Sequence, residues 1–141
     1  MNRQEFTKVL SECRKQNGML VKELCFKLQC MSSDLYKFEN AKHNYNMQKC
    51  FEYLNAIGTK LVISAAEGNN IVFEDYAALL KFVVNTRIAQ GYSQRRLASE
   101  IGCAYVTIAY FEKQKTVMTI DTFLKIADAL KLTVDISPKT A

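Results

Sequence analysis

The stretch Gly91–Lys115, GYSQRRLASEIGCAYVTIAYFEKQK, predicts two short helices joined by a tight turn. Ser93 is a good N-cap, because its hydroxyl can accept a hydrogen bond from a free N–H group of the first helical turn. Gly102 ends the first helix, since glycine enters the left-handed C-cap conformation at little cost. The second helix is expected from about Ala104. Apolar residues recur at helical spacing on both sides of the turn: Leu97, Ala98, Ile101, Ile108 and Phe111.

Two helices joined in this way form a helix-turn-helix, the unit that places its second helix in a DNA major groove. Over about Tyr76–Ser137 the sequence resembles the lambda-repressor-like helix-turn-helix family, also called the XRE or Cro family. The residues that carry the resemblance are Arg87, Gly91-Tyr92-Ser93-Gln94, Leu97-Ala98, Ile101-Gly102, Thr107-Ile108 and Phe111-Glu112. The stretch TIDTFLKIADALKL (Thr119–Leu132) is similar to the closing helix of the family. The resemblance implies a prokaryotic transcription regulator.

The chain matches itself when it is shifted by 73 residues, the offset between Gly18 and Gly91. The identities include Arg14 with Arg87, Leu24 with Leu97, Cys30 with Cys103, Glu39 with Glu112 and Ala56 with Ala129. A gapless register of this length predicts a tandem duplication of one helix-turn-helix unit. We expect a first, degenerate unit at 1–66, a second unit at 71–138, and a linker at 67–70 within the turn-rich segment EGNNI.

Each unit is expected to contain four helices and then a strand. In the first unit the helices are expected at about 3–17, 21–28, 32–41 and from 47, where Asn46 is the cap and Gly58 the stop. In the second unit the first helix is expected at about 74–90, with acidic residues in its first turn, where the helix dipole favours them. Thr119 is expected to cap the last helix.

A short β-branched segment follows the last helix of each unit, Lys60–Ala65 and Leu132–Ser137. A lone strand cannot satisfy its backbone groups, so we predict that the two segments pair antiparallel across a pseudo-twofold axis. The predicted fold is all-α with a short β-strand after each unit, an intrachain pseudo-dimer joined by a two-stranded antiparallel sheet. The second unit also resembles HipB-like antitoxins, whose dimers join through such strands. A homodimer with strands paired between chains is the alternative.

The resemblance places the base-facing residues at the start of the third helix of each unit. In the second unit these are Ala104, Tyr105, Val106 and Tyr110, and in the first they are Met31, Ser32, Ser33 and Lys37. The second unit lacks the Arg, Asn or Gln side chains that usually read base edges. Two interpretations stay open: the tyrosine hydroxyls and apolar groups read an A·T-leaning site, or the aromatic patch contacts a protein, since tyrosine is enriched at interfaces.

Candidates for phosphate contacts gather at one helix N-terminus of the second unit, which itself attracts anions. By resemblance Gln94 contacts a phosphate, and the further candidates are Ser93, Arg95, Arg96, Lys113 and Lys115. In the first unit Leu20 and Val21 stand at the positions of Ser93 and Gln94, so neither the cap nor the phosphate ligand is present there. The remaining candidates are Lys22, Lys27, Lys37 and Lys42. The first unit is expected to bind weakly or to serve as scaffold; the alternative for all these charges is a solvated face.

Two ion pairs are further candidates, Arg14 with Glu39 in the first unit and Arg87 with Glu112 in the second. The alternative is that these are unpaired surface charges. An exposed pair would contribute at most about 1 kcal/mol to stability.

Composition limits the class of protein. The net charge of +5 allows nucleic-acid binding without requiring it. The five cysteines form no CxxC pair and are expected to be buried and reduced, and His43 has no metal-ligand spacing to them. We expect no catalytic residues, no metal site and no cofactor, because no phosphate loop or nucleophile elbow is present. With no signal peptide and no membrane-spanning apolar run, we expect a soluble cytoplasmic protein without a membrane partner.

The sequence therefore predicts a sequence-specific regulator of transcription that binds double-stranded DNA and reads an imperfect palindrome with unlike half-sites. A protein-interaction module, such as an antitoxin-like prophage accessory protein with a toxin-like partner, is the alternative. It is motivated by the Ala104-Tyr105-Val106 surface, which offers so few base-reading donors.

Overall fold

A computed structural model describes residues 1–65 and 68–138, and its elements follow the order α1–α4, β1, β2, α5–α8, β3. The helices of the first half are α1 (Arg3–Gln16), α2 (Val21–Leu28), α3 (Ser32–Glu39) and α4 (Met47–Ile57). Those of the second half are α5 (Tyr76–Ala89), α6 (Gln94–Ile101), α7 (Tyr105–Glu112) and α8 (Ile120–Ala129). The strands are β1 (Thr59–Ala65), β2 (Asn70–Phe73) and β3 (Leu132–Pro138). The fold is therefore mostly helical, with one small antiparallel sheet.

Strand β1 lies at the centre of this sheet, in the order β2-β1-β3. It pairs antiparallel with β3, from Thr59 opposite Pro138 to Ala65 opposite Leu132. The predicted pairing of these two segments is confirmed. The predicted two-stranded sheet is wrong, because β2 pairs with the other edge of β1.

The chain reverses between β1 and β2 near Gly68, whose φ of +108° favours glycine. Asn70 already belongs to β2, although the sequence predicts a linker that extends through it. Glu67 of the predicted linker lies outside the described residues.

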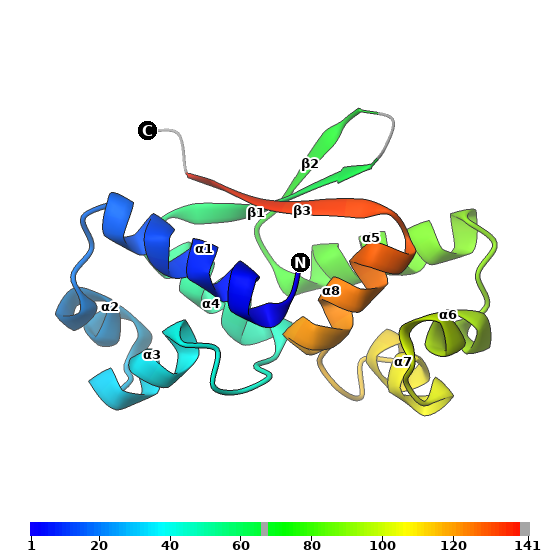
Figure 1. Ribbon diagram of the computed structural model, residues 1–141, viewed down its shortest axis with the longest axis horizontal. Helices are drawn as coiled ribbons and strands as arrows, with labels where there is room; N and C mark the ends of the chain where they lie inside the picture. The colour runs from blue at the N-terminus through cyan, green and yellow to red at the C-terminus, as the bar shows by residue number, and fades with distance from the viewer. Residues whose placement is uncertain (66–67, 139–141) are drawn as a thin grey trace.

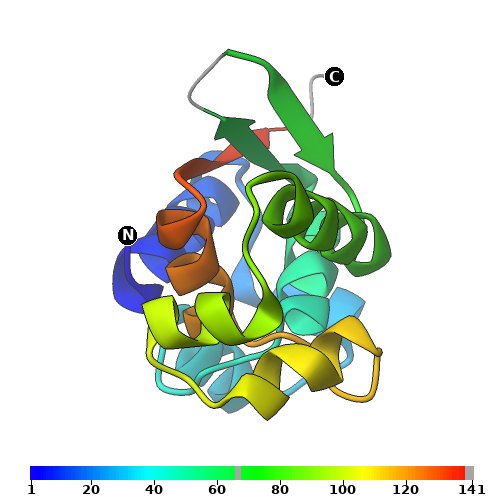
Figure 2. The ribbon, with the colours of Figure 1, turned by 90° about the vertical axis from the view of Figure 1, so that its right-hand side faces the viewer.

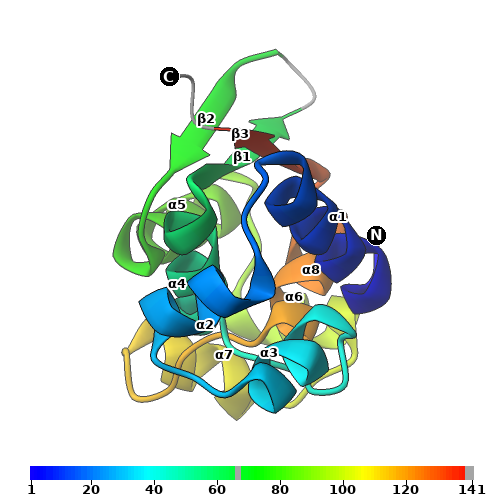
Figure 3. The same ribbon diagram turned by 90° about the vertical axis from the view of Figure 1, so that its left-hand side faces the viewer.

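The sheet covers one side of a shared core. Figure 1 shows α1, α4, α5 and α8 beneath the sheet, with α2 and α3 at one end and α6 and α7 at the other. Views from the two ends place α2, α3, α6 and α7 on the side away from the sheet (Figures 2 and 3). We call the surface formed by these four helices the lower face. Buried side chains from both halves and from the sheet form one apolar cluster, which includes Leu54, Leu61, Phe123, Val134 and Ile136.

The two halves also meet through the loops that precede α4 and α8. The Met47 N–H donates to the Met118 carbonyl, and the Ile120 N–H donates to the Tyr45 carbonyl, each with an N–O distance of 2.8 Å. Asn46 and Thr119 form an isolated antiparallel bridge between these bonds. The two loops are therefore held together by backbone hydrogen bonds independent of the sheet.

Most predicted helix boundaries are confirmed. Asn46 and Thr119 accept hydrogen bonds from the first turns of α4 and α8, and Gly58 ends α4 in the left-handed conformation. The expected start of α5 at residue 74 is wrong. Asp75 is its N-cap, because its carboxylate accepts from the Ala78 N–H, so no acidic residue lies in the first turn. Helix α3 ends at Glu39, since Ala41 adopts a left-handed φ of 54°.

The cysteines are less buried than the sequence predicts. Cys50 is buried, and burial raises the pKa of its thiol. Cys13, Cys25, Cys30 and Cys103 are free and half-buried.

Helix α2 is capped less favourably than α6, which occupies the matching place in the second half. Ser93 accepts from the Arg96 N–H at 3.0 Å, whereas Leu20 makes no side-chain cap hydrogen bond to α2. The C-cap of α6 is Gly102, and that of α2 is Gln29 with a left-handed φ of 53°. A side chain in this conformation is strained, so α2 is disfavoured at both ends.

Leu20→Ser and Gln29→Gly should each raise the free energy of unfolding by about 1 kcal/mol, the first by adding a cap and the second by relieving backbone strain. Urea unfolding followed by circular dichroism measures both. As controls, Ser93→Ala and Gly102→Ala should lower stability by a similar amount. A lower unfolding midpoint for Leu20→Ser would contradict the capping argument.

Candidate nucleic-acid interface

Helices α6 and α7 form the second-half part of the lower face. Their buried sides contribute Leu97, Ala98, Ile101, Ile108 and Phe111 to the core. The opposite side of α7 leaves Tyr105, Val106 and Tyr110 exposed, and Ala104, the N-cap of α7, is also exposed. The four residues predicted to face bases therefore lie together at the surface. Thr107 is exposed beside them and was not predicted, although a hydroxyl both donates and accepts hydrogen bonds.

Three cations of this half lie over tyrosine rings. The Arg95 guanidinium carbon is 4.2 Å from the ring centroid of Tyr105, and that of Arg96 is 4.3 Å from the ring centroid of Tyr92. Lys115 Nζ is 5.5 Å from the ring centroid of Tyr110. Stacking holds a guanidinium by its face and leaves its N–H groups free at the edge. Arg95 and Lys115 are thus held next to the exposed side of α7.

Two predicted phosphate contacts have partners within the chain. Ser93 Oγ accepts from the Arg96 N–H, and its own hydroxyl hydrogen stays available to donate. Gln94 Nε2 donates to Glu112 Oε1 at 2.9 Å, which uses one of its two hydrogens. Lys113 and Lys115 are exposed after α7. The candidate contacts are therefore arranged around the N-terminus of α6 and the C-terminal end of α7.

A buried ion pair holds α7 against α5. Arg87 Nε and the Arg87 Nη2 atom donate to the two carboxylate oxygens of Glu112 at 2.8 and 2.9 Å. Arg87 Nη1 donates to the Tyr92 carbonyl at 2.7 Å. The two side chains are only 10% and 9% exposed. The predicted pairing is confirmed, and because the pair is buried the small contribution expected of an exposed pair does not apply.

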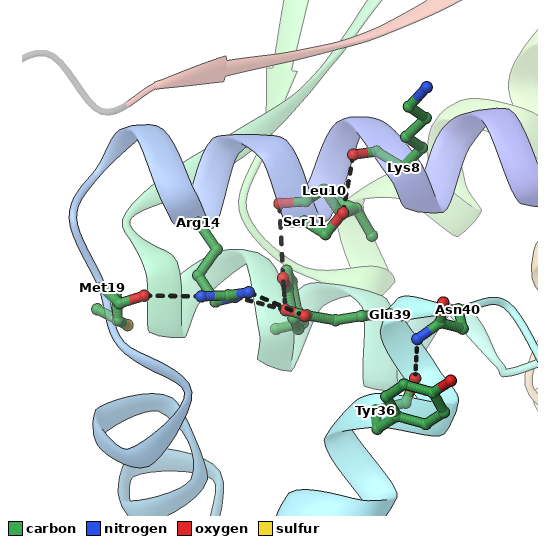
Figure 4. Close-up of polar contacts among 9 residues, drawn as sticks. Lys8, Leu10, Ser11, Arg14, Met19, Tyr36, Glu39 and Asn40 are labelled. Atoms are coloured by element: carbon green, nitrogen blue, oxygen red, sulfur yellow. Dashed lines mark hydrogen bonds and ion pairs between the residues drawn. The ribbon is translucent and has the colours of Figure 1, made fainter.

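The first half contains the same arrangement (Figure 4). Arg14 donates to both Glu39 oxygens at 2.6 and 3.1 Å, and to the Met19 carbonyl at 2.9 Å. Hydrogen bonding to Glu39 raises the pKa of Arg14, so the guanidinium stays charged.

The third donor to the glutamate differs between the halves. Val21 stands at the position of Gln94 and cannot donate, and instead the Tyr53 hydroxyl donates to Glu39 Oε2 at 2.6 Å. Burial raises the pKa of Tyr53, which keeps this hydroxyl protonated. Ile126 stands at the position of Tyr53 in the second half and cannot donate. Each carboxylate therefore accepts from one neutral side chain, Tyr53 in the first half and Gln94 in the second.

The first-half candidates are also at the surface. Those predicted to face bases are Ser32, Ser33 and Lys37, and those predicted to contact phosphate are Lys22 and Lys42, all exposed. Met31 is exposed as well. Lys27 Nζ donates to the Ala56 carbonyl at 3.4 Å.

Residues 85–136 match the family model described as helix-turn-helix. The match runs from within α5 through α6, α7 and α8 into β3. The comparisons with curated proteins and with solved structures found no match. This part of the chain is thus similar to helix-turn-helix domains of the XRE type, a class that binds DNA.

Two further findings concern the described residues alone. Within 1–65 and 68–138, no helix is both long and apolar enough to cross a membrane. The same residues contain no group of three or more His, Cys, Asp or Glu side chains placed to hold a metal ion.

Replacing Glu112 with Ala should lower the free energy of unfolding by about 3 kcal/mol, because it leaves the Arg87 guanidinium buried without its partner. Adding Arg87→Met should recover part of this stability, a coupling that a double-mutant cycle in urea measures. Glu100→Ala, at an exposed position of α6, is the control and should change little. A decrease below about 1 kcal/mol for Glu112→Ala would mean that the pair contributes no more than an exposed one.

Proposed function

We propose that the protein is a sequence-specific regulator that binds double-stranded DNA with α7 in the major groove. The observation that carries this proposal is the position of Arg95, stacked on Tyr105 beside the exposed side of α7, within the domain that matches the helix-turn-helix family. A guanidinium held there can donate to a phosphate while the helix contacts base edges.

The proposed roles divide between base and phosphate contacts. The Tyr105 and Tyr110 hydroxyls would donate to bases or phosphates, and Ala104 and Val106 would contact thymine methyl groups. Thr107 adds a further donor on the same helix. The proposed phosphate contacts are Ser93, Gln94, Arg95, Arg96, Lys113 and Lys115. Gln94 would use the Nε2 hydrogen that Glu112 leaves free.

We further propose that the two halves act as a pseudo-dimer on an imperfect palindrome. The hydrogen bonds between the halves support this. At the offset of 73, Met47 corresponds to Ile120 and Tyr45 to Met118. A twofold rotation that exchanges the two halves would therefore convert each of the two loop hydrogen bonds into the other. The central pair of the β1–β3 ladder, Val62 opposite Asp135, likewise joins corresponding positions. The half-sites would then lie about one DNA turn, roughly 34 Å, apart.

A protein-interaction module of antitoxin type is the second candidate. The exposed Tyr105, Val106 and Tyr110 favour it, because they offer large rigid contact area and no Arg, Asn or Gln for base readout.

Replacing Arg95 and Arg96 with Ala should weaken binding to every duplex. The slope of log K against log salt should fall by about 2, because each phosphate that is no longer neutralised accounts for roughly 0.9 of the slope. Fluorescence anisotropy over a salt series measures the slope. The matched control is Lys8→Ala with Lys15→Ala on α1, which removes equal charge; Figure 4 shows Lys8 directed away from α3. Unchanged affinity for the arginine variant would reject these phosphate contacts.

Selection from a random duplex pool at about 0.1 M salt, where the phosphate term is partly screened, tests the palindrome. We expect enrichment of two unlike half-sites about one DNA turn apart. A single enriched half-site would reject the pseudo-dimer while keeping α7 as reader. No enrichment from folded protein would reject DNA reading and favour the protein-interaction module.

A further inference from the structure

An apolar groove lies between α2 and α3 on the lower face. It is lined by Val21, Ser32, Ser33, Leu35, Tyr36 and Glu39 and has a volume of about 390 Å³. We call it the α2–α3 groove. Tyr36 is 63% exposed, and Leu20, directly before Val21, is 64% exposed. Exposed apolar side chains that gather in one place are typical of interaction surfaces.

The second half has polar or small residues at the same places. Ser93, Gln94 and Ala109 correspond to Leu20, Val21 and Tyr36 at the offset of 73. Ser93 caps its helix and Gln94 bonds Glu112, so polar residues fit this backbone and strengthen it. The first half lacks the cap, because Leu20 makes no side-chain hydrogen bond, and it supplies the donor to Glu39 from Tyr53 instead. The fold therefore permits an apolar residue at Val21 but gains no cap from Leu20.

A second depression lies along α2. Its lining includes Lys22, Cys25, Phe26, Lys27 and Cys30, and Lys22 directly follows Val21 of the groove. Phe26 is 86% exposed, whereas Ser99 stands at the matching place in α6. Helix α2 thus exposes a further large apolar side chain, Phe26, outside the α2–α3 groove.

The charge around this surface is mainly positive. Lys22, Lys27 and Lys37 are exposed, and Glu23 offsets one of them. Glu39 is neutralised by its ion pair with Arg14, whereas Asp34 accepts only from the Met31 N–H and keeps its negative charge, so the positive excess is small. A second copy of the chain would bring the same lysines into contact and be repelled, whereas an acidic partner would be attracted.

We propose that the α2–α3 groove docks an acidic amphipathic helix of another protein. Its apolar side chains would pack against Leu20, Val21 and Tyr36, and its carboxylates would pair with Lys22 and Lys37. The partner would compete with DNA for the first half-site, because Ser32 and Ser33 line the groove and are also base-facing candidates of the first half. This interaction goes beyond the proposed DNA binding and does not require it, although the shared lower face would place the partner beside DNA held by α7.

The test uses the full chain and a displayed library of random peptides about 16 residues long, enough for four helical turns. Selection is made without DNA. We expect enriched peptides with acidic residues and with apolar residues at helical spacing. Synthetic copies should bind about tenfold or more weakly to the variant Leu20→Ser, Val21→Gln, Tyr36→Ala, and also to Lys22→Glu with Lys37→Glu.

The first variant carries residues that the second half accepts at the same positions, so it is expected to fold, and urea unfolding checks this. Ile88→Ala, at an exposed apolar position of α5, is the control and should leave peptide affinity unchanged.

Enrichment of neutral or basic peptides, or equal binding by the groove variant, would overturn the proposal. A dimer that the groove variant abolishes would overturn it in favour of a second copy. No enriched peptide, together with loss of DNA affinity in the groove variant, would overturn it in favour of DNA. The peptide selection is made without DNA, so its result can be interpreted even if α7 does not bind DNA.

Discussion

The backbone ladder between β1 and β3 sets the relative position of the two halves. Seven residues of each strand face each other, and Leu61 and Ile63 on one strand lie opposite Ile136 and Val134 on the other. These side chains belong to the same core as the helices below them. A one-residue shift of β3 along β1 would turn Val134 and Ile136 toward the opposite face of the sheet. The register is therefore fixed by burial, and with it the placement of α2–α3 and α6–α7 on one face.

Within each half, a buried arginine–glutamate pair holds the third helix against the first, α3 against α1 and α7 against α5. Each arginine joins three segments, since it reaches both the glutamate near the end of the third helix and a carbonyl before the second. The third donor to the carboxylate comes from different elements, Tyr53 of α4 in one half and Gln94 of α6 in the other. The same electrostatic requirement is met in two ways, which leaves the Val21 position free to be apolar.

Local signals carry most of the fold that can be predicted from the sequence. Ser93, Asn46 and Thr119 mark helix starts, and Gly58 and Gly102 mark helix ends, because capping depends on a few neighbouring backbone groups. The strand pairing was predicted because each β-branched segment needs a partner and the other segment is the simplest one. Strand β2 was missed because its four residues adjoin the turn-rich segment and owe their conformation to pairing with β1.

The exposure of the candidate residues was predictable, but their contacts within the chain were not. Family resemblance placed Tyr105 on the DNA-facing side, and Arg95 was a candidate from its charge at the start of α6, yet the stacking of one on the other depends on rotamers. Gln94 was predicted to contact phosphate, and its bond to Glu112 depends on a side chain 18 positions away. The exposure of Phe26 follows from which neighbours pack around α2, which helical periodicity alone does not determine.

The order of the strands along the chain has a consequence during protein synthesis. Strand β2 follows β1 after a short turn, so this hairpin can close as soon as both have left the ribosome. The other edge of β1 stays open until α5–α8 and then β3 have been translated, because β3 is the last described element. Closing so long a loop is slow, and in that interval the nascent chain presents an unpaired strand edge that invites association with other chains. Chaperone binding to ribosome-bound fragments is therefore expected to be strongest after β1 emerges and to fall once β3 is released.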